Sequence, residues 1–440
     1  MHIGMDDTDS TKSGCTTYVA ALLLEKLIKL KTEFTDYPNL IRLNPNVPWK
    51  TRGNGALCLR FNYEQELVDT IKETALDILE TNADLEAKGT DPGIVFLNKS
   101  NIPKEITAFA KKAMTGIVTL KEAVRLITKY KAEAMGYNKC RGVIGALAAI
   151  GENLHGDHTY ELIAYRTLEN RGTKRRIDKN SIMNMDQQTQ PCTFNNVDYE
   201  KKRVIITPRG PDPIFFGIRG ETPEIVKKAF RLLKPKETVE RWLVFRSNQG
   251  TDAHLAEAGA LSAIQPYSSI IAKGTVSRKP TKIPLRHTIF SIKDETAEVD
   301  CAAFEPTGTL RKIAEQLVVG DVIEIYGAVR KRLKTERLTV NLEKINIITL
   351  SPKVVYRNPI CSACGKRLES MGKDKGYRCK KCGTKYRKAE KTGSIEERNL
   401  NLGLYISSTG SQRHLTKPFR RYGQEKKRME ESNLIEGWHS

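Results

Sequence analysis

The sequence predicts a multidomain protein of mixed α/β and α+β class, with a β-barrel and a zinc ribbon toward the C-terminus. Three observations carry this prediction: strand and helix patterns alternate over residues 1–268, five strands with a single helix follow, and four cysteines form two CxxC pairs. A chain of 440 residues is long enough for roughly two to four domains. Its hydrophobic fraction of 39% is enough for packed cores and argues against global disorder.

Residues 1–135 are expected to form a first domain in which helices cover a sheet. The period of the apolar residues predicts strands at 2–5, 56–61 and 94–97, and helices around 19–27, from about 64, over 103–114 and over 120–130. The last of these helices follows Thr119, with Glu122 at the spacing of a capping box.

Residues 136–268 are expected to form a ferredoxin-like α+β domain. The pattern predicts helices over 141–150 and 224–233, and strands at 160–166, 204–207, 215–218 and 242–245. The last four elements in chain order are strand, strand, helix and strand, which is compatible with half of a ferredoxin-like fold. The polar stretch 171–190 lacks periodicity and is interpreted as a loop or interdomain segment. The sequence leaves open whether the first two domains interleave.

Residues 269–352 have the element order of an OB-fold barrel. Strands are predicted at 274–278, 287–293, 297–304, 322–329 and 338–348, with one helix over 310–317. Five strands with a helix between the third and the fourth are typical of this fold. OB-folds bind single-stranded or structured nucleic acid, and also oligosaccharides and proteins.

Residues 353–395 carry the most specific motif of the chain. Cys361-Ser362-Ala363-Cys364 is followed after fourteen residues by Cys379-Lys380-Lys381-Cys382. Two such pairs complete a tetrahedral site of four thiolates, which predicts a structural Zn²⁺ with no position free to activate water. The many lysines and arginines around the cysteines indicate a basic zinc ribbon that contacts phosphates.

The charge of the chain predicts a polyanionic partner. It has 73 Lys and Arg against 52 Asp and Glu, a net charge of +21, and residues 351–440 hold 21 of the basic and nine of the acidic residues. Such a surface favours nucleic acid, although solubility alone is the simpler alternative. The C-terminal segment 396–440 is expected to contact phosphates through its basic side chains, and the alternative is a solvated helix. These side chains are Arg420, Arg421, Lys426, Lys427 and Arg428.

The sequence also favours a cytoplasmic location. No apolar run approaches the length of a membrane span, and the N-terminus lacks the pattern of a secretory signal. Nine cysteines, an odd number in a long chain, argue against a disulfide scaffold and for a reducing compartment.

The loop Asp6-Asp7-Thr8-Asp9 is the candidate catalytic motif. Three carboxylates at a strand end repel one another unless a cation compensates, and hard oxygen ligands suit Mg²⁺ carrying nucleotide phosphates. Thr16 and Thr17 follow near a helix start, where backbone N–H groups hold phosphate. A polar capping loop is the alternative. Asp7-x-Asp9-x-Thr11 also matches the nucleophile loop of haloacid-dehalogenase phosphotransferases, but no convincing downstream acidic motif or lysine completes it. The P-loop and dinucleotide-binding motifs are absent.

Four short clusters of glycine and polar residues suggest one composite site. They are Thr51-Arg52-Gly53-Asn54-Gly55, Lys139-Cys140-Arg141-Gly142, Arg209-Gly210-Pro211-Asp212-Pro213 and residues 246–255, which include Asn248, Asp252 and His254. Glycine lets the backbone approach a ligand, while arginine and asparagine supply directed hydrogen bonds. Turns use the same residues, so each cluster is weak alone. His254 is interpreted as a structural histidine rather than a catalyst.

In combination and in order, these motifs resemble the archaeal tRNA-isoleucine 2-agmatinylcytidine synthetases over nearly the whole chain. The resemblance rests on the Gly-x-Asp-Asp-Thr-Asp-Ser loop, the Cys-Thr-Thr and Thr-Arg-Gly-Asn-Gly-Ala segments, Arg-Gly-Pro-Asp-Pro, Ser-Asn-Gln-Gly-Thr-Asp-Ala-His-Leu, the OB-fold and the zinc ribbon. It implies an ATP-dependent ligase with a kinase-like N-terminal domain. The implied reaction attaches agmatine to C2 of the wobble cytidine of an isoleucine tRNA with a CAU anticodon, which then decodes AUA.

The resemblance further implies that the cytidine is activated by phosphorylation, that ATP yields AMP, and that Thr16 matches an autophosphorylated threonine. Asp6, Asp7 and Asp9 are then expected to hold Mg²⁺ and ATP. Further candidates for the binding pocket are Arg52, Gly53, Asn54, Gly55, Arg209, Asp212, Asn248 and Asp252, with Asp212 as one possibility for the agmatine guanidinium. No protein partner is inferred. The alternatives are a non-catalytic OB-fold and zinc-ribbon binding protein, and a haloacid-dehalogenase-like phosphotransferase acting on nucleic acid.

Overall fold

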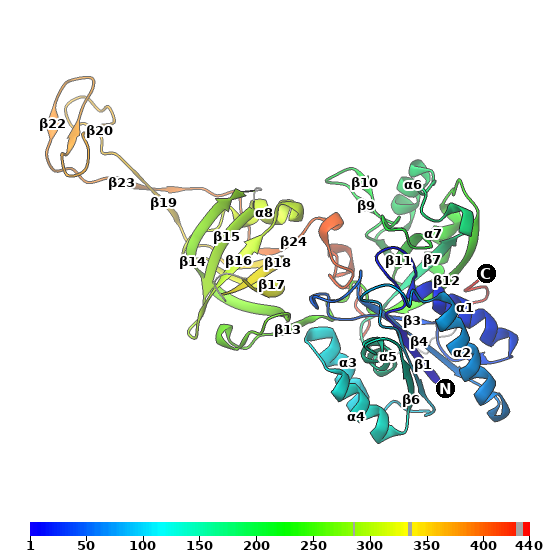
Figure 1. The fold of residues 1–440 in the computed structure, drawn as a ribbon. Coiled ribbons are helices and arrows are strands. Elements are labelled where there is room, and N and C mark those ends of the chain that lie inside the picture. The colour runs from blue at the N-terminus through cyan, green and yellow to red at the C-terminus, as the bar shows by residue number, and fades with distance from the viewer. Residues whose placement is uncertain (285–286, 333–336, 428–433) are drawn as a thin grey trace.

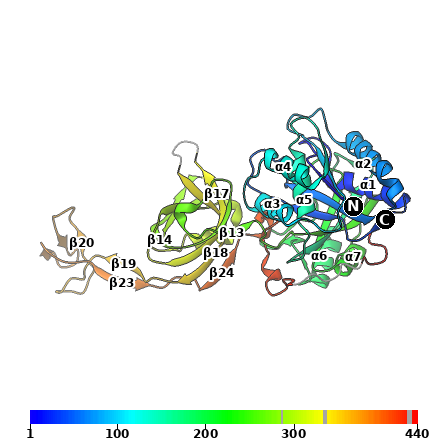
Figure 2. The ribbon, with the colours of Figure 1, turned by 90° about the horizontal axis from the view of Figure 1, so that it is seen from below.

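The computed structural model describes residues 1–284, 287–332, 337–427 and 434–440. Three parts follow one another in space: a large α/β body, a β-barrel, and a small ribbon at the end of a two-stranded stalk (Figures 1 and 2). The prediction of a mixed α/β protein with an OB-fold barrel and a zinc ribbon is confirmed. Within the described residues, no helix has the length and apolar character needed to span a membrane.

One sheet runs through the whole body, so the first two predicted domains share a single scaffold. In the described part of the chain it has ten strands in the order β6-β5-β1-β4-β3-β12-β7-β11-β8, with β2 paired to β4. Their bounds are β1 His2–Asp6, β2 Glu33–Phe34, β3 Asn39–Arg42, β4 Gly55–Asn62, β5 Gly93–Leu97, β6 Glu133–Gly136, β7 Thr159–Arg166, β8 Thr193–Phe194, β11 Ile214–Gly220 and β12 Val239–Ser247. The parallel pairing of β3 with β12 joins the two halves. The domain limits expected from the sequence stay predictions.

Helices cover both faces of the sheet, and each face has its own apolar core. The N-terminal helices α1 (Thr16–Lys29) and α2 (Val68–Asn82) share one core with the side chains of Leu57, Leu59 and Phe61. The alternate residues Ala56 and Cys58 of the same strand belong to the core of the opposite face, because successive side chains of a strand point to opposite sides. That face is covered by α3 (Lys104–Thr115), α4 (Leu120–Tyr130) and α5 (Gly142–Gly151).

Local signals placed most of these elements correctly. The capping box of α4 is present, since Thr119 Oγ1 accepts from the backbone N–H of Glu122 at 3.3 Å and the Thr119 N–H donates to Glu122 Oε2 at 2.8 Å. The predicted helix over 224–233 is α7 (Pro223–Leu232), and it packs on β7 and β11.

Two secondary-structure predictions were wrong. The stretch 171–190, interpreted as a loop, contains α6 (Lys179–Thr189), whose N-terminus is capped by the Asp178 side chain at 3.0 Å from the N–H of Asn180. Its buried face has few apolar residues, among them Ile182 and Met185, so the helical period is faint in the sequence. The strand expected at 204–207 is reduced to β10 (Arg203–Val204), paired with β9 (Val197–Asp198) outside the main sheet.

The barrel closes as an OB-fold should. Its strands are β14 Ser269–Ile283, β15 His287–Lys293, β16 Glu298–Ala303, β17 Val322–Lys331 and β18 Leu338–Thr349, and pairing of β14 with β17 closes the cylinder. The short helix α8 (Thr309–Ala314) lies between the third and fourth of these strands, as predicted. Two short edge strands, β13 (Leu255–Glu257) and β24 (Gly403–Ile406), pair with β14 and β18.

The zinc ribbon lies far from the body. Strands β19 (Lys353–Arg357) and β23 (Thr392–Glu396) pair as a stalk that leads from the barrel to the three-stranded sheet of β20 (Glu369–Ser370), β21 (Tyr377–Arg378) and β22 (Lys385–Tyr386) (Figures 1 and 2). The ribbon's own core consists of Cys361, Leu368 and Cys379 with a few partly buried neighbours. A core of this size cannot hold a fold without a metal.

The C-terminal segment packs on the body. The prediction that its basic side chains contact phosphates was wrong for Arg420, Arg421 and Lys426, which form ion pairs within the protein. Arg421 is fully buried and lies 2.6 Å from Glu221 and 2.8 Å from Asp157. Arg420 pairs with Asp186 at 3.0 Å, and Lys426 pairs with Glu221 at 3.1 Å. These charges are neutralised within the protein, because acidic partners far away in sequence face them. Lys427 is exposed, and Arg428 lies outside the described residues.

The end of the chain also completes the apolar core. Trp438 is 7% exposed, and its ring lies 5.7 Å from that of Tyr37 and 6.0 Å from that of Phe34. Its carbonyl accepts from the N–H of Val244 at 2.9 Å, next to the bridge between Leu243 and His439. The described residues after β24, 407–427 and 434–440, therefore lie along the body instead of extending into solvent.

Helix α5 approaches β1 and β5 so closely that side chains are excluded between them. A Cβ atom on Gly4 would lie 2.1 Å from the carbonyl oxygen of Ala146, and one on Gly93 would lie 2.1 Å from the backbone nitrogen of Val143. Backbone atoms of a packed helix cannot move aside as the end of a side chain can. Glycine is therefore required at these positions by space, with no need for an unusual backbone angle.

We predict that Gly4→Ala lowers the free energy of unfolding by about 2–3 kcal/mol, because overpacking against a rigid backbone forces a shift of the helix. Urea or guanidinium unfolding followed by circular dichroism measures the change. The control is Gly156→Ala, since nothing lies within 4 Å of a Cβ at that position. Equal stability of the two variants would contradict the close packing of α5 on β1.

Candidate active site and zinc centre

A cavity of about 360 Å³ lies where β1 ends and α1 begins. The structure brings nine of the predicted site residues together in its wall: Asp6, Asp7, Asp9, Thr16, Arg52, Gly53, Asn54, Gly55 and Asp212. They come from four separate segments. Arg141 and Gly210 also line the wall, so three of the four predicted clusters reach it, whereas no residue of 246–255 does. Apolar residues such as Leu43, Ile117 and Val118 line another part of the wall.

The acidic loop is held by the elements on either side of it. Asp6 is the last residue of β1, and its carboxylate packs against α5, where a Cβ on Gly145 would lie 1.8 Å from Asp6 Oδ2. Asp7 has a φ of 59°, and its Oδ2 lies 3.1 Å from Arg141 Nη2 and 3.2 Å from the backbone nitrogen of Asp91. The close packing of α5 thus fixes both carboxylates.

Burial makes the ionised carboxylates of this loop unfavourable. The pKa of Asp6 is raised well above its usual range, first by burial and then by the charge of Asp7. Burial raises the pKa of Asp7 to about 6, although Arg141 opposes the shift. The pKa of Asp9 is also raised by burial, with Arg52 acting in the other direction. A cation in the cavity would relieve this strain on the ionised forms.

The carboxylates fit a Mg²⁺ that completes its shell with substrate and water. Among the described residues, no three of these acidic side chains place their oxygens within 4.8 Å of one another, so they do not form a closed cage. Asp7 and Asp9 each pair with an arginine, while Asp6 has no ion pair in the described part of the chain. Mg²⁺ is commonly bound by one or two carboxylates together with phosphates, which agrees with this open arrangement.

Thr16 lies at the first turn of α1, on the wall of the same cavity. Its Oγ1 accepts a hydrogen bond from the buried Thr8 hydroxyl at 3.1 Å, which ties it to the acidic loop. The first N–H groups of a helix are free to bind phosphate. Burial raises the pKa of the neighbouring Cys15 to about 11, so that thiol is neutral.

Arg52 organises the loops around the cavity. Its guanidinium lies 3.3 Å from both Asp9 Oδ2 and Asp212 Oδ2, and it donates to the carbonyl oxygens of Ser10 and Ser13 at 2.7 and 3.0 Å. Asp212 is also paired with Arg175 at 3.1 Å. The Arg52 side chain therefore joins Asp9 and Asp212 to the glycine-rich loop, residues 51–55, to which Arg52 itself belongs.

Three predicted pocket residues lie elsewhere. Arg209 lines a neighbouring cavity with Lys174 and Arg175. The side chain of Asn248 bonds the backbone of Arg42 at 2.8 and 2.9 Å and thereby fixes the end of β3. Asp252 pairs with Lys344 of the barrel and accepts from the N–H of Lys417 at 2.7 Å. Such polar residues serve both turns and ligands, and the sequence alone does not separate the two uses.

His254 is structural, as interpreted from the sequence. It is fully buried, and its Nε2 lies 3.1 Å from Glu343 Oε2 of the barrel. It does not line the cavity beside the acidic loop, which we call the catalytic cavity in view of the function proposed for it.

Sequence reasoning missed several residues of the cavity wall. Arg42 and Lys50 add positive charge, and Trp49 is 45% exposed there. His414 comes from the C-terminal segment, and its Nδ1 lies 3.0 Å from both Arg219 and Gln249. Arg42, burial and Arg219 hold the pKa of His414 well below its usual range, so the imidazole is neutral. No local motif marks a histidine that reaches the site from the other end of the chain.

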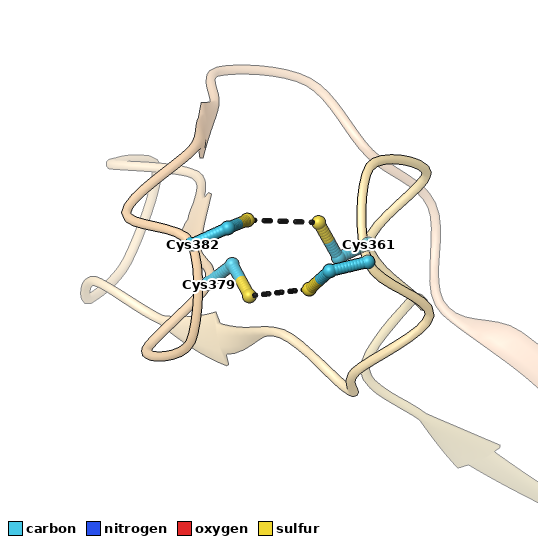
Figure 3. A group of neighbouring side chains, drawn as sticks. Cys361, Cys379 and Cys382 are labelled. Carbon is cyan, nitrogen blue, oxygen red and sulfur yellow. Dashed lines mark hydrogen bonds between the residues drawn. The ribbon is translucent and has the colours of Figure 1, made fainter.

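The four predicted zinc ligands converge in the ribbon. Sγ of Cys361 lies 3.5 Å from that of Cys382, Sγ of Cys364 lies 3.4 Å from that of Cys379, and all four lie within 4.8 Å of one another (Figure 3). A tetrahedral zinc with bonds of about 2.3 Å separates its sulfurs by close to these distances.

The two CxxC turns have the same backbone pattern. The N–H of Gly365 donates to the carbonyl of Cys361 at 2.8 Å, and the N–H of Gly383 donates to that of Cys379 at 2.9 Å. Both glycines have positive φ, 70° and 76°, as the turn requires. The sequence signal and the geometry agree on a closed, structural Zn²⁺ site.

A cavity with an acidic loop at a helix N-terminus, combined with an OB-fold barrel and a basic zinc ribbon, defines an enzyme that acts on nucleic acid. Family models match four stretches of the chain: the TiaS TCKD domain at residues 2–139, the TiaS FLD domain at 140–254, an OB-fold nucleic acid binding domain at 270–348, and the TiaS C-terminal zinc ribbon domain at 358–400. The chain belongs to the TiaS family of isoleucine-tRNA 2-agmatinylcytidine synthetases.

Relatives and solved structures support this membership over nearly the full length. The synthetase of Archaeoglobus fulgidus is 40% identical, with 94% of this chain and 96% of the relative covered, and that of Methanocaldococcus jannaschii is 41% identical, with 95% and 98% covered. A structure described as a complex of TiaS with its isoleucine tRNA and ATP has a TM-score of 0.85 at 38% identity, covering 96% and 97% of the two chains. A complex described as containing that tRNA, AMPCPP and agmatine has a TM-score of 0.81 at 36% identity, covering 96% of each chain.

We predict that Asp7→Asn stabilises the protein more at pH 8 than at pH 5 when Mg²⁺ and nucleotide are absent. The gain in melting temperature over wild type should be about 2 °C larger at pH 8. Because the folded-state pKa is raised to about 6, wild-type stability falls as Asp7 ionises with rising pH, and asparagine removes that titration. Asparagine also tolerates the positive φ. Differential scanning calorimetry measures the effect, with the exposed Asp77→Asn as control. A larger gain at pH 5 would mean that the pairing with Arg141 outweighs burial.

We predict that removal of zinc unfolds the ribbon and leaves the body and barrel folded, because the ribbon has little core of its own. After treatment with a strong chelator, the four ribbon thiols should become reactive toward a thiol reagent while the main thermal transition stays within about 2 °C. Cys379→Ser should have the same effect, whereas Cys192→Ser, outside the ribbon, should not. Loss of the main transition on chelation would show that the ribbon supports the rest of the fold.

Proposed function

We propose that this protein is an ATP-dependent ligase that attaches agmatine to C2 of the wobble cytidine of an isoleucine tRNA with a CAU anticodon, so that the tRNA decodes AUA. The observation that carries the proposal is the cavity formed by the acidic loop Asp6–Asp9 beside the N-terminus of α1, in a chain that matches the family over nearly its full length. The relatives crystallised with tRNA, ATP and agmatine bind the three substrates that this reaction needs.

The acidic residues are proposed to receive the nucleotide. Asp6, Asp7 and Asp9 would hold Mg²⁺ with the phosphates of ATP, and the ion would supply positive charge to the phosphoryl group in transfer. Thr16, whose hydroxyl is held by Thr8, is the proposed phosphoacceptor. The N–H groups at the start of α1 would bind the transferred phosphoryl group.

The glycine-rich loop is proposed to shape the substrate pocket. Gly53, Asn54 and Gly55 line the cavity, and Arg52 ties this loop to the acidic loop. Asp212 already pairs with Arg52 and Arg175, so we propose that it positions Arg52 rather than binding agmatine alone. Arg209, Asn248 and Asp252 are proposed to support the cavity from outside, through the contacts described above.

The chemistry explains why a kinase-like site serves a ligase. The C2 carbonyl of cytosine is amide-like, hence a poor electrophile, and its oxygen is a poor leaving group. Transfer of a phosphoryl group to that oxygen corrects both faults. The agmatine amine then attacks C2, a C–N bond forms, and the oxygen departs with the phosphate as the amine loses a proton. Conversion of ATP to AMP gives up two phosphoryl groups: one leaves with the cytidine oxygen as phosphate, and the other is taken by a second acceptor, the Thr16 hydroxyl or water.

The barrel and the ribbon are proposed to bind the tRNA. Both are modules that contact nucleic acid backbone or unpaired bases, and most lysines and arginines of the ribbon are exposed. A tRNA substrate also agrees with the cytoplasmic location expected from the sequence, which stays a prediction. A non-catalytic binding protein would have no use for the buried carboxylates of the acidic loop.

We predict that the protein forms AMP and modified tRNA only when ATP, agmatine and the CAU tRNA are all present. Thr16→Ala should lower the rate by at least about 100-fold and abolish labelling of the protein by γ-phosphate-labelled ATP, whereas Thr17→Ala, one residue further along the helix, should keep the label. Liquid chromatography of nucleosides from digested tRNA detects the product. AMP formation without agmatine, or release of phosphate from nucleic acid ends alone, would point to the phosphotransferase alternative.

A further inference from the structure

A second cavity, of about 460 Å³, adjoins the catalytic cavity. It lies where the body, the barrel and the C-terminal segment meet. Its polar lining is basic: Arg42, Lys50, Arg52, Arg330, Arg413 and His414. No acidic side chain is among the described residues that line it. Arg42, Lys50, Arg52 and His414 also line the catalytic cavity, so the two cavities share one wall. We call the second space the junction cavity.

The charges of the junction cavity come from distant parts of the chain. Arg42 ends β3 of the body, Lys50 lies in the loop that follows, Arg330 lies on β17 of the barrel, and Arg413 lies in the C-terminal segment after β24. In Figure 1 the C-terminal segment after β24 lies between the barrel and the body. Convergence of cations from three parts of the fold does not follow from the charge of any one segment.

Arg42 is the central observation. Its Nε is shielded from solvent and has no hydrogen-bond partner, and within the described residues its guanidinium makes neither a hydrogen bond nor an ion pair. Burial lowers the pKa of Arg42 to about 10, which still leaves it charged at neutral pH. The Arg42 side chain is partly buried, and a shielded donor such as its Nε is unfavourable when it is left unpaired, whereas a bound anion could accept from the fixed fork of guanidinium donors.

Among the other cations, Arg52 pairs with Asp9 and Asp212, whereas Lys50 and Arg330 donate to neutral acceptors. Arg330 donates to the carbonyl oxygen of Asn46 at 2.6 Å, Arg413 donates to the Asn46 side chain at 2.6 Å, and Lys50 donates to the carbonyl oxygen of Arg52 at 2.9 Å. Arg413 also pairs with Glu343 at 3.2 Å, but that carboxylate is shared with His254.

Like charges consequently crowd this space. The pKa of Lys50 is lowered by burial and by the charges of Arg413 and Arg330, and the pKa of Arg330 is lowered by burial and Arg413. An anion in the junction cavity would replace this repulsion with attraction and would give Arg42 an acceptor.

We propose that the junction cavity is a phosphate subsite that holds one phosphate group beside the reacting base. The proposal rests on the proposed function, because the phosphate belongs to one of its substrates. A phosphodiester of the tRNA strand that enters the catalytic cavity is one source, and a phosphate of ATP is the other. The site would also hold the barrel, the C-terminal segment and the body in one arrangement around the bound phosphate.

The test compares Arg42→Gln and Lys50→Gln with Arg231→Gln, which removes an equal charge from the exposed surface of α7. Binding of a CAU tRNA transcript and of ATP is measured separately on the full-length protein, without agmatine, over a series of salt concentrations. If the phosphate comes from the tRNA, each of the two cavity variants should weaken tRNA binding by about tenfold, reduce the salt slope by about 0.7, and leave ATP binding unchanged.

If the phosphate comes from ATP, the same two variants should weaken ATP binding and leave the tRNA salt slope unchanged. Variants that bind both ligands as Arg231→Gln does would overturn the subsite. Arg42→Lys, which keeps the charge, should recover part of the lost affinity, and thermal melting of each variant identifies loss of fold. This test measures binding alone and does not depend on turnover. If a separate assay showed that the protein does not transfer agmatine, the proposed function would be disproved, while the phosphate subsite would still be supported by the binding data.

Discussion

The contact between α5 and the strands β1 and β5 is the constraint on which the catalytic cavity depends. Backbone meets backbone there, because Gly4 and Gly93 leave no side chain between the helix and the sheet. The same approach presses Gly145 against the Asp6 carboxylate and places Arg141, just before the helix, against Asp7. A wider spacing would let water reach the carboxylates and would lower their raised pKa values, so the chemistry of the acidic loop follows from a packing distance.

The C-terminal segment shows that a basic sequence need not be a basic surface. Of the charges expected to bind phosphate, Arg421 is fully buried between Glu221 and Asp157. Ion pairs of this kind fix a segment in place, because removing either partner leaves a buried charge uncompensated. The segment therefore carries His414 into the catalytic cavity and Arg413 into the junction cavity. The exposed positive charge of this end of the chain belongs instead to the ribbon, whose side chains have few acidic neighbours.

The parts of the molecule that the sequence predicted are those defined by local spacing. The capping box of α4, the two CxxC turns and the strand periods of the barrel each depend on residues a few positions apart. The acidic loop and the glycine-rich loop were also found locally, and the sheet brings them together. Helix α6 was missed because its buried face is largely polar. Arg42 and His414 were missed because neighbours in the cavities such as Arg330 for Arg42, and Arg219 and Gln249 for His414, lie over 150 residues away in sequence, which no motif records.

Arg52 lies between a group of acidic residues and a group of basic residues. It lines both cavities, and it pairs with Asp9 and Asp212 on the acidic side while Lys50 and Arg42 lie on the basic side. The proposed reaction needs this separation, because a cationic amine and Mg²⁺ must meet the same base as a polyanionic strand. A uniformly basic cavity would bind the strand and repel the amine, and a uniformly acidic one would do the reverse. With the acidic loop on one side of the catalytic cavity and the basic residues on the wall that it shares with the junction cavity, the base can lie between them.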